Sequence, residues 1–137
     1  MVFHVGQSAS IKKRFTEKEV ANFSSISMDD NKIHTDVEFA KNSRFGQRIV
    51  QGPLVDSLIG GLLGSHLPGN GTIYLSHEVQ FKKPVFIDEL ITVFVKIEHI
   101  RLDKNIITLR TWVEKENREI AIEGKSIVMF LNKGLWY

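Results

Sequence analysis

Residues 53–64 read PLVDSLIGGLLG, and this stretch decides what the rest of the chain must build around it. Only Asp56 and Ser57 interrupt its apolar residues before Ser65, so a helix here is apolar on nearly every side. Pro53 suits the first turn of a helix, because its missing N–H would have no partner there. A helix that is apolar nearly all round is a buried one. The sequence therefore predicts a central helix that the rest of the chain covers.

Alternation of apolar and polar residues dominates the sequence after this helix. A period of two is typical of strands that bury one face. It recurs in four segments, residues 73–81, 91–98, 107–113 and 120–131. An N-terminal strand over residues 8–15 is also expected. Because the helix needs cover on most sides, we predict an α+β fold in which a curved antiparallel sheet wraps around it.

Length and composition describe an ordinary globular protein, with 42% hydrophobic and 25% charged residues. With no linker or internal repeat, residues 1–137 are expected to form a single domain. The net charge of +2 is too mild and too evenly spread to favour a nucleic-acid partner. No stretch approaches the roughly 20 apolar residues of a membrane span. The first residues lack the pattern of a signal peptide, so a cytoplasmic protein is expected.

The composition also limits the chemistry. The chain has no cysteine, which excludes disulfides, thiolate catalysis and cysteine metal ligands. None of its five histidines shows the H-E-x-x-H spacing of a helical zinc site. We therefore expect neither a bound metal nor cysteine-based catalysis.

Two capping boxes lie on either side of a polar segment. Residues 16–19 read TEKE and predict the start of a helix that ends near Met28. Residues 35–38 read TDVE and predict a second, short helix to about Lys41. Residues 29–34 would then form a tight loop that is held at both ends, which would fix the geometry of its side chains.

Asp29 and His34 stand five residues apart in this loop, with Asn31 between them. A carboxylate and an imidazole at this spacing can hold one water molecule between them. Gly52 precedes the central helix, where a backbone N–H can stabilise negative charge on a carbonyl oxygen. Together these groups can add water to an activated acyl chain or remove it. Each also has a structural interpretation, since aspartates often accept loop N–H groups and Asn31 is equally suited to shaping the turn.

These residues resemble the MaoC-like hydratases of the hot-dog fold, in particular the short, single-domain (R)-specific enoyl-CoA hydratases. The family's catalytic pattern is Asp, Asn two residues later and His three residues after that, and it corresponds here to Asp29, Asn31 and His34. The family's loop before the central helix corresponds to RIVQG, residues 48–52. The segments GTIYL, residues 71–75, and VQFKKPVF, residues 79–86, are also similar, so the resemblance covers nearly the whole chain.

Several positions depart from the family pattern. Gln51 stands where histidine is common, and Pro53 stands where methionine is common. Gly60 replaces a small hydroxyl residue, which would alter the polarity or depth of a pocket. Asp56 lies in an otherwise apolar helix and needs a partner, either across a subunit interface or near the helix start. His77 is interpreted as structural or surface-exposed, with no role in the site.

The resemblance implies hydration of trans-2-enoyl-CoA to (R)-3-hydroxyacyl-CoA and the reverse dehydration, which is the reaction of a hydro-lyase. It implies a homodimer, an acyl-CoA substrate and no cofactor, because CoA is part of the substrate. The implied roles are acid–base catalysis by Asp29 and His34, binding of the thioester oxygen by Gly52, orientation of the water or the loop by Asn31, and an acyl pocket at Gly60, Leu62 and Leu63. A hot-dog thioesterase and a non-catalytic subunit that binds acyl thioesters are the alternatives.

Overall fold

The computed structural model describes residues 3–131, which form one antiparallel sheet and four helices. The sheet has five strands in the order β1-β3-β4-β5-β2. Its strands are β1 (Ser8–Lys13), β2 (Thr72–Phe81), β3 (Ile91–Arg101), β4 (Ile106–Lys115) and β5 (Ile120–Phe130). The helices are α1 (Glu17–Ser27), α2 (Lys32–Thr35), α3 (Val37–Lys41) and α4 (Gly52–Ser65).

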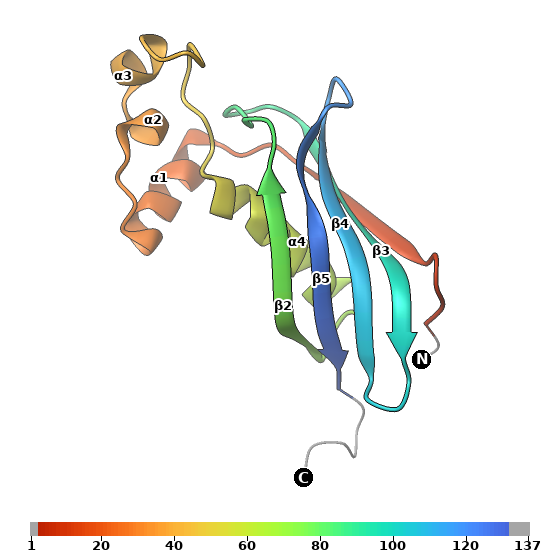
Figure 1. Ribbon diagram of the computed structural model, residues 1–137. Helices are drawn as coiled ribbons and strands as arrows, with labels where there is room; N and C mark the ends of the chain where they lie inside the picture. Colours follow the sequence, from red (N-terminus) through yellow and green to blue (C-terminus); the bar gives the residue numbers. More distant parts are fainter. Residues whose placement is uncertain (1–2, 132–137) are drawn as a thin grey trace.

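Helix α4 lies against one face of the curved sheet, and α1, α2 and α3 lie to one side, beyond the start of α4 (Figure 1). The core is the layer between α4 and the sheet. Its helix residues are Val55, Ile59, Leu62 and Leu63. Its innermost strand residues include Ile91, Val93, Val95, Leu109 and Val113, each with 0% of its surface exposed. The α+β fold with a buried central helix is therefore confirmed, while the assignment of residues 1–137 to one domain stays a prediction.

The first predicted helix start is confirmed by its side-chain contacts. Thr16 Oγ1 accepts a hydrogen bond from Glu19 N at 3.2 Å, and Glu19 Oε1 accepts one from Thr16 N at 3.0 Å. The second was misplaced by one residue. Thr35 is the last residue of α2, and Asp36 is the cap of α3, accepting a hydrogen bond from Phe39 N at 3.0 Å.

Only residues 29–31 of the loop expected over residues 29–34 lie outside a helix. Asn31 Oδ1 accepts a hydrogen bond from Ile33 N at 3.2 Å, and this contact starts α2 at Lys32. A side-chain oxygen that replaces a missing helical partner is a strong local signal for a helix start. His34 therefore projects from a short helix rather than from a loop.

Strand β2 forms an edge of the sheet. It pairs with β5, while its other side has no partner strand within the part of the chain that the structure describes. A bulge interrupts its register between Tyr74 and Ser76. Bulges bend a strand and increase its twist, and this one separates Tyr74 from the regularly paired residues 76–81.

Candidate active site

His34 is held by a single backbone contact. Its Nδ1 lies 2.7 Å from the carbonyl oxygen of Ile49, and 10% of the side chain is exposed. A carbonyl oxygen only accepts, so Nδ1 carries the proton and donates it. The other ring nitrogen, Nε2, is therefore the atom through which this side chain can exchange a proton.

Asp29 lies directly after α1, at a point where Met28 adopts a left-handed conformation with φ 64°. Its Oδ1 accepts a hydrogen bond from Asn31 N at 3.1 Å, and its own N–H donates to Ser27 Oγ at 3.2 Å. Its other oxygen, Oδ2, lies 3.9 Å from His34 Nε2. One oxygen thus holds the loop, while the second faces the histidine.

The separation of 3.9 Å is too long for a direct hydrogen bond. It does allow one water molecule, lying to the side, to contact both Oδ2 and Nε2. The structure brings Asp29 rather than Asp30 beside His34. The Asn31 side chain is used to cap α2, so it positions the helix that carries His34.

The start of α4 leaves backbone donors free. Gln51 occupies the cap position and makes no side-chain cap, and Pro53 has no N–H. Gly52 N–H donates to no acceptor within residues 3–131. A Cβ atom at Gly52 would lie 2.9 Å from the Phe81 ring. Only glycine fits beside this ring without displacing it, and the helix dipole adds partial positive charge at the same point.

A cavity of about 270 Å³ borders this helix start. Gly52, Val55, Phe81 and Ile49 are among its lining residues. Ile49 is also the residue whose carbonyl holds His34. The predicted acid–base pair and the predicted oxyanion donor are therefore connected through one residue at the edge of this cavity.

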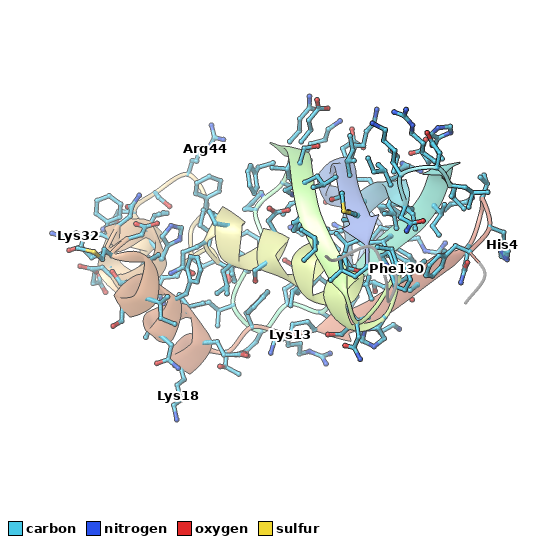
Figure 2. The ribbon with its side chains drawn as sticks, turned by 90° about the horizontal axis from the view of Figure 1, so that it is seen from below. His4, Lys13, Lys18, Lys32, Arg44 and Phe130 are labelled. Carbon is cyan, nitrogen blue, oxygen red and sulfur yellow. The ribbon has the colours of Figure 1, made fainter. Side chains whose placement is uncertain are left out.

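Basic side chains also line the cavity. Lys82 pairs with Glu123 at 2.6 Å and Lys83 with Glu119 at 3.5 Å. Arg44 lies on the loop between α3 and α4, and its side chain points away from the protein body (Figure 2). The charges of both lysines are thus balanced by carboxylates, Glu123 on β5 and Glu119 directly before it.

Gln51, the residue that departs from the family pattern, ties α1 to the start of α4. Its side chain is fully buried. Its Nε2 donates to Val20 O at 3.0 Å and to Ser24 Oγ at 2.9 Å. Its Oε1 has no partner among the described residues. This amide therefore fixes the segment that carries Asp29 relative to the helix that carries Gly52.

The residues predicted for the acyl pocket lie elsewhere on α4. Leu62 and Leu63 have 0% and 1% of their surface exposed and belong to the core. A Cβ atom at Gly60 would lie 3.6 Å from the Tyr74 ring. None of the three lines the cavity beside Gly52. Their role in binding an acyl chain stays a prediction.

Asp56 has a partner that the sequence did not reveal. Its two oxygens lie 2.7 and 2.9 Å from His77 Nε2, on β2 of the same chain. His77 Nδ1 lies 2.9 Å from Ser126 Oγ, which in turn lies 2.9 Å from the Tyr74 hydroxyl. The sequence held one signal for this contact, because the alternation in β2 places His77 on the same face as Val79 and Phe81.

This order of Asp, His and Ser matches a hydrolase triad in its contacts alone. Ser126 has 0% of its surface exposed, and its oxygen already contacts both His77 and Tyr74. A hydroxyl without access cannot attack a substrate. The network formed by Asp56, His77, Ser126 and Tyr74, called here the α4–β2 network, is therefore structural.

No group of His, Cys, Asp or Glu side chains within residues 3–131 has the arrangement of a metal site. Over the same residues, each helix is too short or too polar to cross a membrane.

Comparison with known proteins shows which family this fold and site come from. Residues 4–119 match the family model described as MaoC like domain. The chain belongs to the MaoC-like domain family. This MaoC-like domain is 43% identical to the (R)-specific enoyl-CoA hydratase of Aeromonas caviae over 90% of its own length and 92% of the relative. It is 35% identical to the (R)-specific enoyl-CoA hydratase of Rhodospirillum rubrum, over 94% and 89% of the two chains.

A solved structure gives the same result for the fold. The (R)-hydratase from A. caviae involved in PHA biosynthesis superimposes with a TM-score of 0.92 at 41% identity, covering 94% of this chain and 98% of that one. The hot-dog fold expected from the resemblance is therefore confirmed, and so is the family.

Proposed function

We propose that this MaoC-like domain is a hydro-lyase that hydrates trans-2-enoyl-CoA to (R)-3-hydroxyacyl-CoA and catalyses the reverse dehydration. The observation that carries the proposal is the arrangement of Asp29 and His34. Asp29 Oδ2 and His34 Nε2 lie 3.9 Å apart, and His34 is bonded to Ile49, three residues before a helix start whose Gly52 N–H has no acceptor among the described residues. The relatives named (R)-specific enoyl-CoA hydratase support the same reaction.

The reaction needs one base, one acid and one oxyanion donor. Asp29 Oδ2 takes a proton from water as the water oxygen bonds to C3 of the enoyl chain. The electrons of the C2–C3 double bond shift toward the thioester, and charge gathers on its oxygen. Gly52 N–H donates to that oxygen, assisted by the dipole of α4. His34 Nε2 then gives a proton to C2, and the thioester carbonyl re-forms.

His34 acts as the acid in its doubly protonated form, because Nδ1–H is committed to Ile49. After the product leaves, a water molecule between the two side chains passes the proton from Asp29 to His34 Nε2, which resets the pair. Dehydration runs the same steps in reverse. The conjugated thioester activates the double bond of the substrate, so the proposed reaction uses no metal or redox cofactor.

We assign the acyl pocket to Gly60, Leu62 and Leu63 on α4. Leu63 is fully buried, so Leu63→Ala should lower the free energy of unfolding by about 2–5 kcal/mol. The space it opens should also raise kcat/KM for eight-carbon relative to four-carbon enoyl-CoA, since each buried methylene contributes about 0.8 kcal/mol. A lower Tm with an unchanged ratio would instead make Leu63 a core residue only.

We further propose a cytoplasmic homodimer. The exposed apolar residues support it, since β2 is an edge strand and unpaired strand edges favour pairing with another chain. Ile73, Leu75 and Phe81 on β2 are 39%, 46% and 53% exposed, and Met28 beside the acid–base pair is 88% exposed. Light scattering at micromolar concentration should give twice the 15.6 kDa mass of one chain. A monomer mass would contradict the dimer.

One assay separates the proposed reaction from its alternatives. With crotonyl-CoA, a hydratase removes the absorbance of the conjugated double bond without releasing CoA. A thioesterase releases CoA, which a thiol reagent detects. A binding subunit gives neither signal, and either of the last two results would reject the proposal.

A further inference from the structure

His34 is bonded to the chain segment that leads into α4. Ile49 O accepts the hydrogen bond from His34 Nδ1 at 2.7 Å, while Ile49 N donates to Ile33 O at 3.2 Å. Gly52, the proposed donor to the thioester oxygen, follows three residues later. Three residues of extended chain span at most about 10 Å. The position of His34 relative to Gly52 is therefore set by a short stretch of backbone.

Backbone contacts anchor this segment independently of α1. Val50 N donates to Val85 O at 2.7 Å, and an isolated β-bridge joins Ile49 to Phe86. Val50 and Val85 are both buried, so this contact is shielded from water. A shift of α1 should therefore leave Gly52 and the cavity beside it in place.

Asp29 is connected to the same segment by a different route, through α1. Its N–H donates to the Oγ of Ser27, the last residue of that helix. About one turn earlier, Ser24 Oγ accepts a hydrogen bond from Gln51 Nε2 at 2.9 Å. Val20 O accepts a second hydrogen bond from the same nitrogen at 3.0 Å. The side chain of Gln51 thus links the helix that leads into Asp29 to the start of α4.

The geometry of Gln51 suits it to hold two helices at a fixed separation. A carbonyl oxygen only accepts, so the side-chain amide nitrogen faces Val20 O. The backbone oxygen of Gln51 accepts from Val55 N at 3.1 Å, which begins the hydrogen bonding of α4. Oε1 has no partner within residues 3–131, so each hydrogen bond that the side chain makes there goes to α1. The side chain is fully buried, which strengthens these bonds.

Other contacts between these regions constrain Asp29 less. Arg48 pairs with Glu17 at the start of α1, but the Glu17 side chain is exposed. Exposed ion pairs contribute little to stability and are screened by salt. Asp29 Oδ2 and His34 Nε2, 3.9 Å apart, are not bonded to each other either. Among these contacts, the buried amide of Gln51 is therefore the one that can fix the position of Asp29.

We propose that Gln51 is a positioning residue, which sets the distance between the Asp29 carboxylate and a thioester held at Gly52. It acts through α1 and touches no reacting atom. A shift of α1 would move Asp29 away from C3 while the thioester stays bound, so it should slow the attack of water more than it weakens binding. A misplacement of about 1 Å can lower a rate by about 100-fold. This inference rests on the proposed function, which places the thioester at Gly52.

Gln51→Met tests the inference, because methionine has a similar volume but cannot donate to Val20 O or Ser24 Oγ. Its kcat for crotonyl-CoA should fall by about 10-fold or more. Butanoyl-CoA is a saturated analogue that cannot be hydrated, and its dissociation constant in calorimetry should stay within about twofold of the wild-type value. Gln51→His, whose neutral ring keeps one N–H donor, should recover part of the lost kcat.

Ser24→Ala is a milder change, which removes one of the two acceptors and leaves Gln51 in place. Its kcat should fall less than that of Gln51→Met. The double variant should have the same kcat as Gln51→Met alone, because two residues that act through one contact do not add their effects.

Ile97→Val is the matched control for a loss of stability. Ile97 is buried, lies opposite Leu109 in the sheet and does not line the cavity beside Gly52. The substitution should lower the Tm through the loss of a buried methyl group, with kcat equal to that of the wild type. A lowered Tm with unchanged kcat in Gln51→Met, or an equal loss of kcat and of butanoyl-CoA binding in that variant, would overturn the inference.

Turnover by the wild type separates this inference from the proposed function. If the wild type hydrates crotonyl-CoA and Gln51→Met keeps its kcat, only the role of Gln51 falls. If the wild type releases CoA instead, the proposed reaction falls, and the kcat for CoA release decides the role of Gln51 in the same way. A wild type with neither activity would overturn both.

Discussion

His34 and His77 each lie beside an aspartate, but their surroundings differ in what they leave open. His77 has both ring nitrogens within 2.9 Å of a partner, and its aspartate contacts it with both oxygens. His34 has one nitrogen bonded to a backbone carbonyl, while the other faces Asp29 across 3.9 Å. A satisfied histidine stabilises a fold, whereas one with a free nitrogen beside a free carboxylate oxygen can work on a substrate.

The Asp56–His77 pair and the Asp29–His34 pair also lie on different parts of the fold. His77 joins the central helix to the sheet, where movement would disturb the core. Asp29 and His34 lie on the short helices and loop beside the sheet, held by backbone hydrogen bonds rather than by each other. Their separation is therefore set by the chain and is preserved when one partner is changed.

The largest effect on catalysis should follow substitution of Asp29 or His34. Asp29→Asn or His34→Ala should lower kcat by about 100-fold or more, because each removes a general acid or base. The Tm should change little for Asp29→Asn, because Oδ1 of asparagine can still accept from Asn31 N. Turnover of crotonyl-CoA and thermal unfolding measure the two effects.

Asp30→Asn is the matched control for that prediction. Asp30 carries the same charge one residue away and is exposed. Its kcat should stay close to the wild-type value. Loss of activity in Asp30→Asn with near-native turnover in Asp29→Asn would show that the wrong aspartate had been assigned to the pair.

A smaller effect on catalysis should follow Gly52→Ala, which alters the open end of α4 without removing a polar group. The added Cβ would lie 2.9 Å from the Phe81 ring, so the ring or the helix start must shift. A displacement of this size at a substrate-positioning site should lower kcat/KM by about 10-fold or more. Adding Phe81→Ala should restore part of the loss. A Gly52→Ala enzyme with native kcat/KM would contradict the placement of the thioester.

Substitution of Asp56, the partner of His77, should instead lower the stability of the fold. Asp56→Ala leaves His77 Nε2 without its partner, and losing a partner of a buried polar group costs about 1–3 kcal/mol. The Tm should therefore fall further than in Asp29→Asn, while kcat falls far less than in that variant. Thermal unfolding and crotonyl-CoA turnover, measured on both variants, would show the crossed pattern. Equal losses in both properties would remove the distinction between the two pairs.

Sequence patterns predicted the parts of the fold that depend on local or periodic signals. The central helix follows from its apolar residues, and the strands follow from their alternation. The contacts of Asp56 did not follow in this way, because His77 lies 21 residues away and is reached only once α4 and β2 are packed together. The start of α2 was missed because Asn31 was considered for orienting the water or for shaping a turn, whereas its side chain caps a helix.

The candidate site was predictable to the extent that it follows a family spacing. Asp29, His34 and Gly52 were identified from their order along the chain. The free Nε2 of His34 was not, since it depends on the carbonyl of Ile49, which approaches only after the loop before α4 has folded back. The burial of Leu62 and Leu63 agrees with the buried central helix that their apolar surroundings predict, whereas a contact with an acyl chain depends on residues far away in the sequence.

The smallest effect should come from exposed carboxylates, which sharpen the contrast with the half-buried Asp56. A hydrogen bond from Lys82 lowers the pKa of Glu123 below its ordinary 4.5, and contacts with Asn117 and Lys83 do so for Glu119. A carboxyl group whose pKa is lower in the folded state adds stability above its unfolded pKa, and this contribution is lost as the pH falls through the folded value. Glu123→Gln should therefore lower the Tm slightly at neutral pH, and its difference from the wild type should shrink as the pH falls below 4.5 and through the lower pKa of the folded state. Salt should reduce the difference as well, because exposed charges are screened. Glu98→Gln, at an exposed position on β3, is the control, and its Tm should equal that of the wild type at neutral pH. A Glu123→Gln difference that persists in acid would mean that the side chain acts through packing rather than charge.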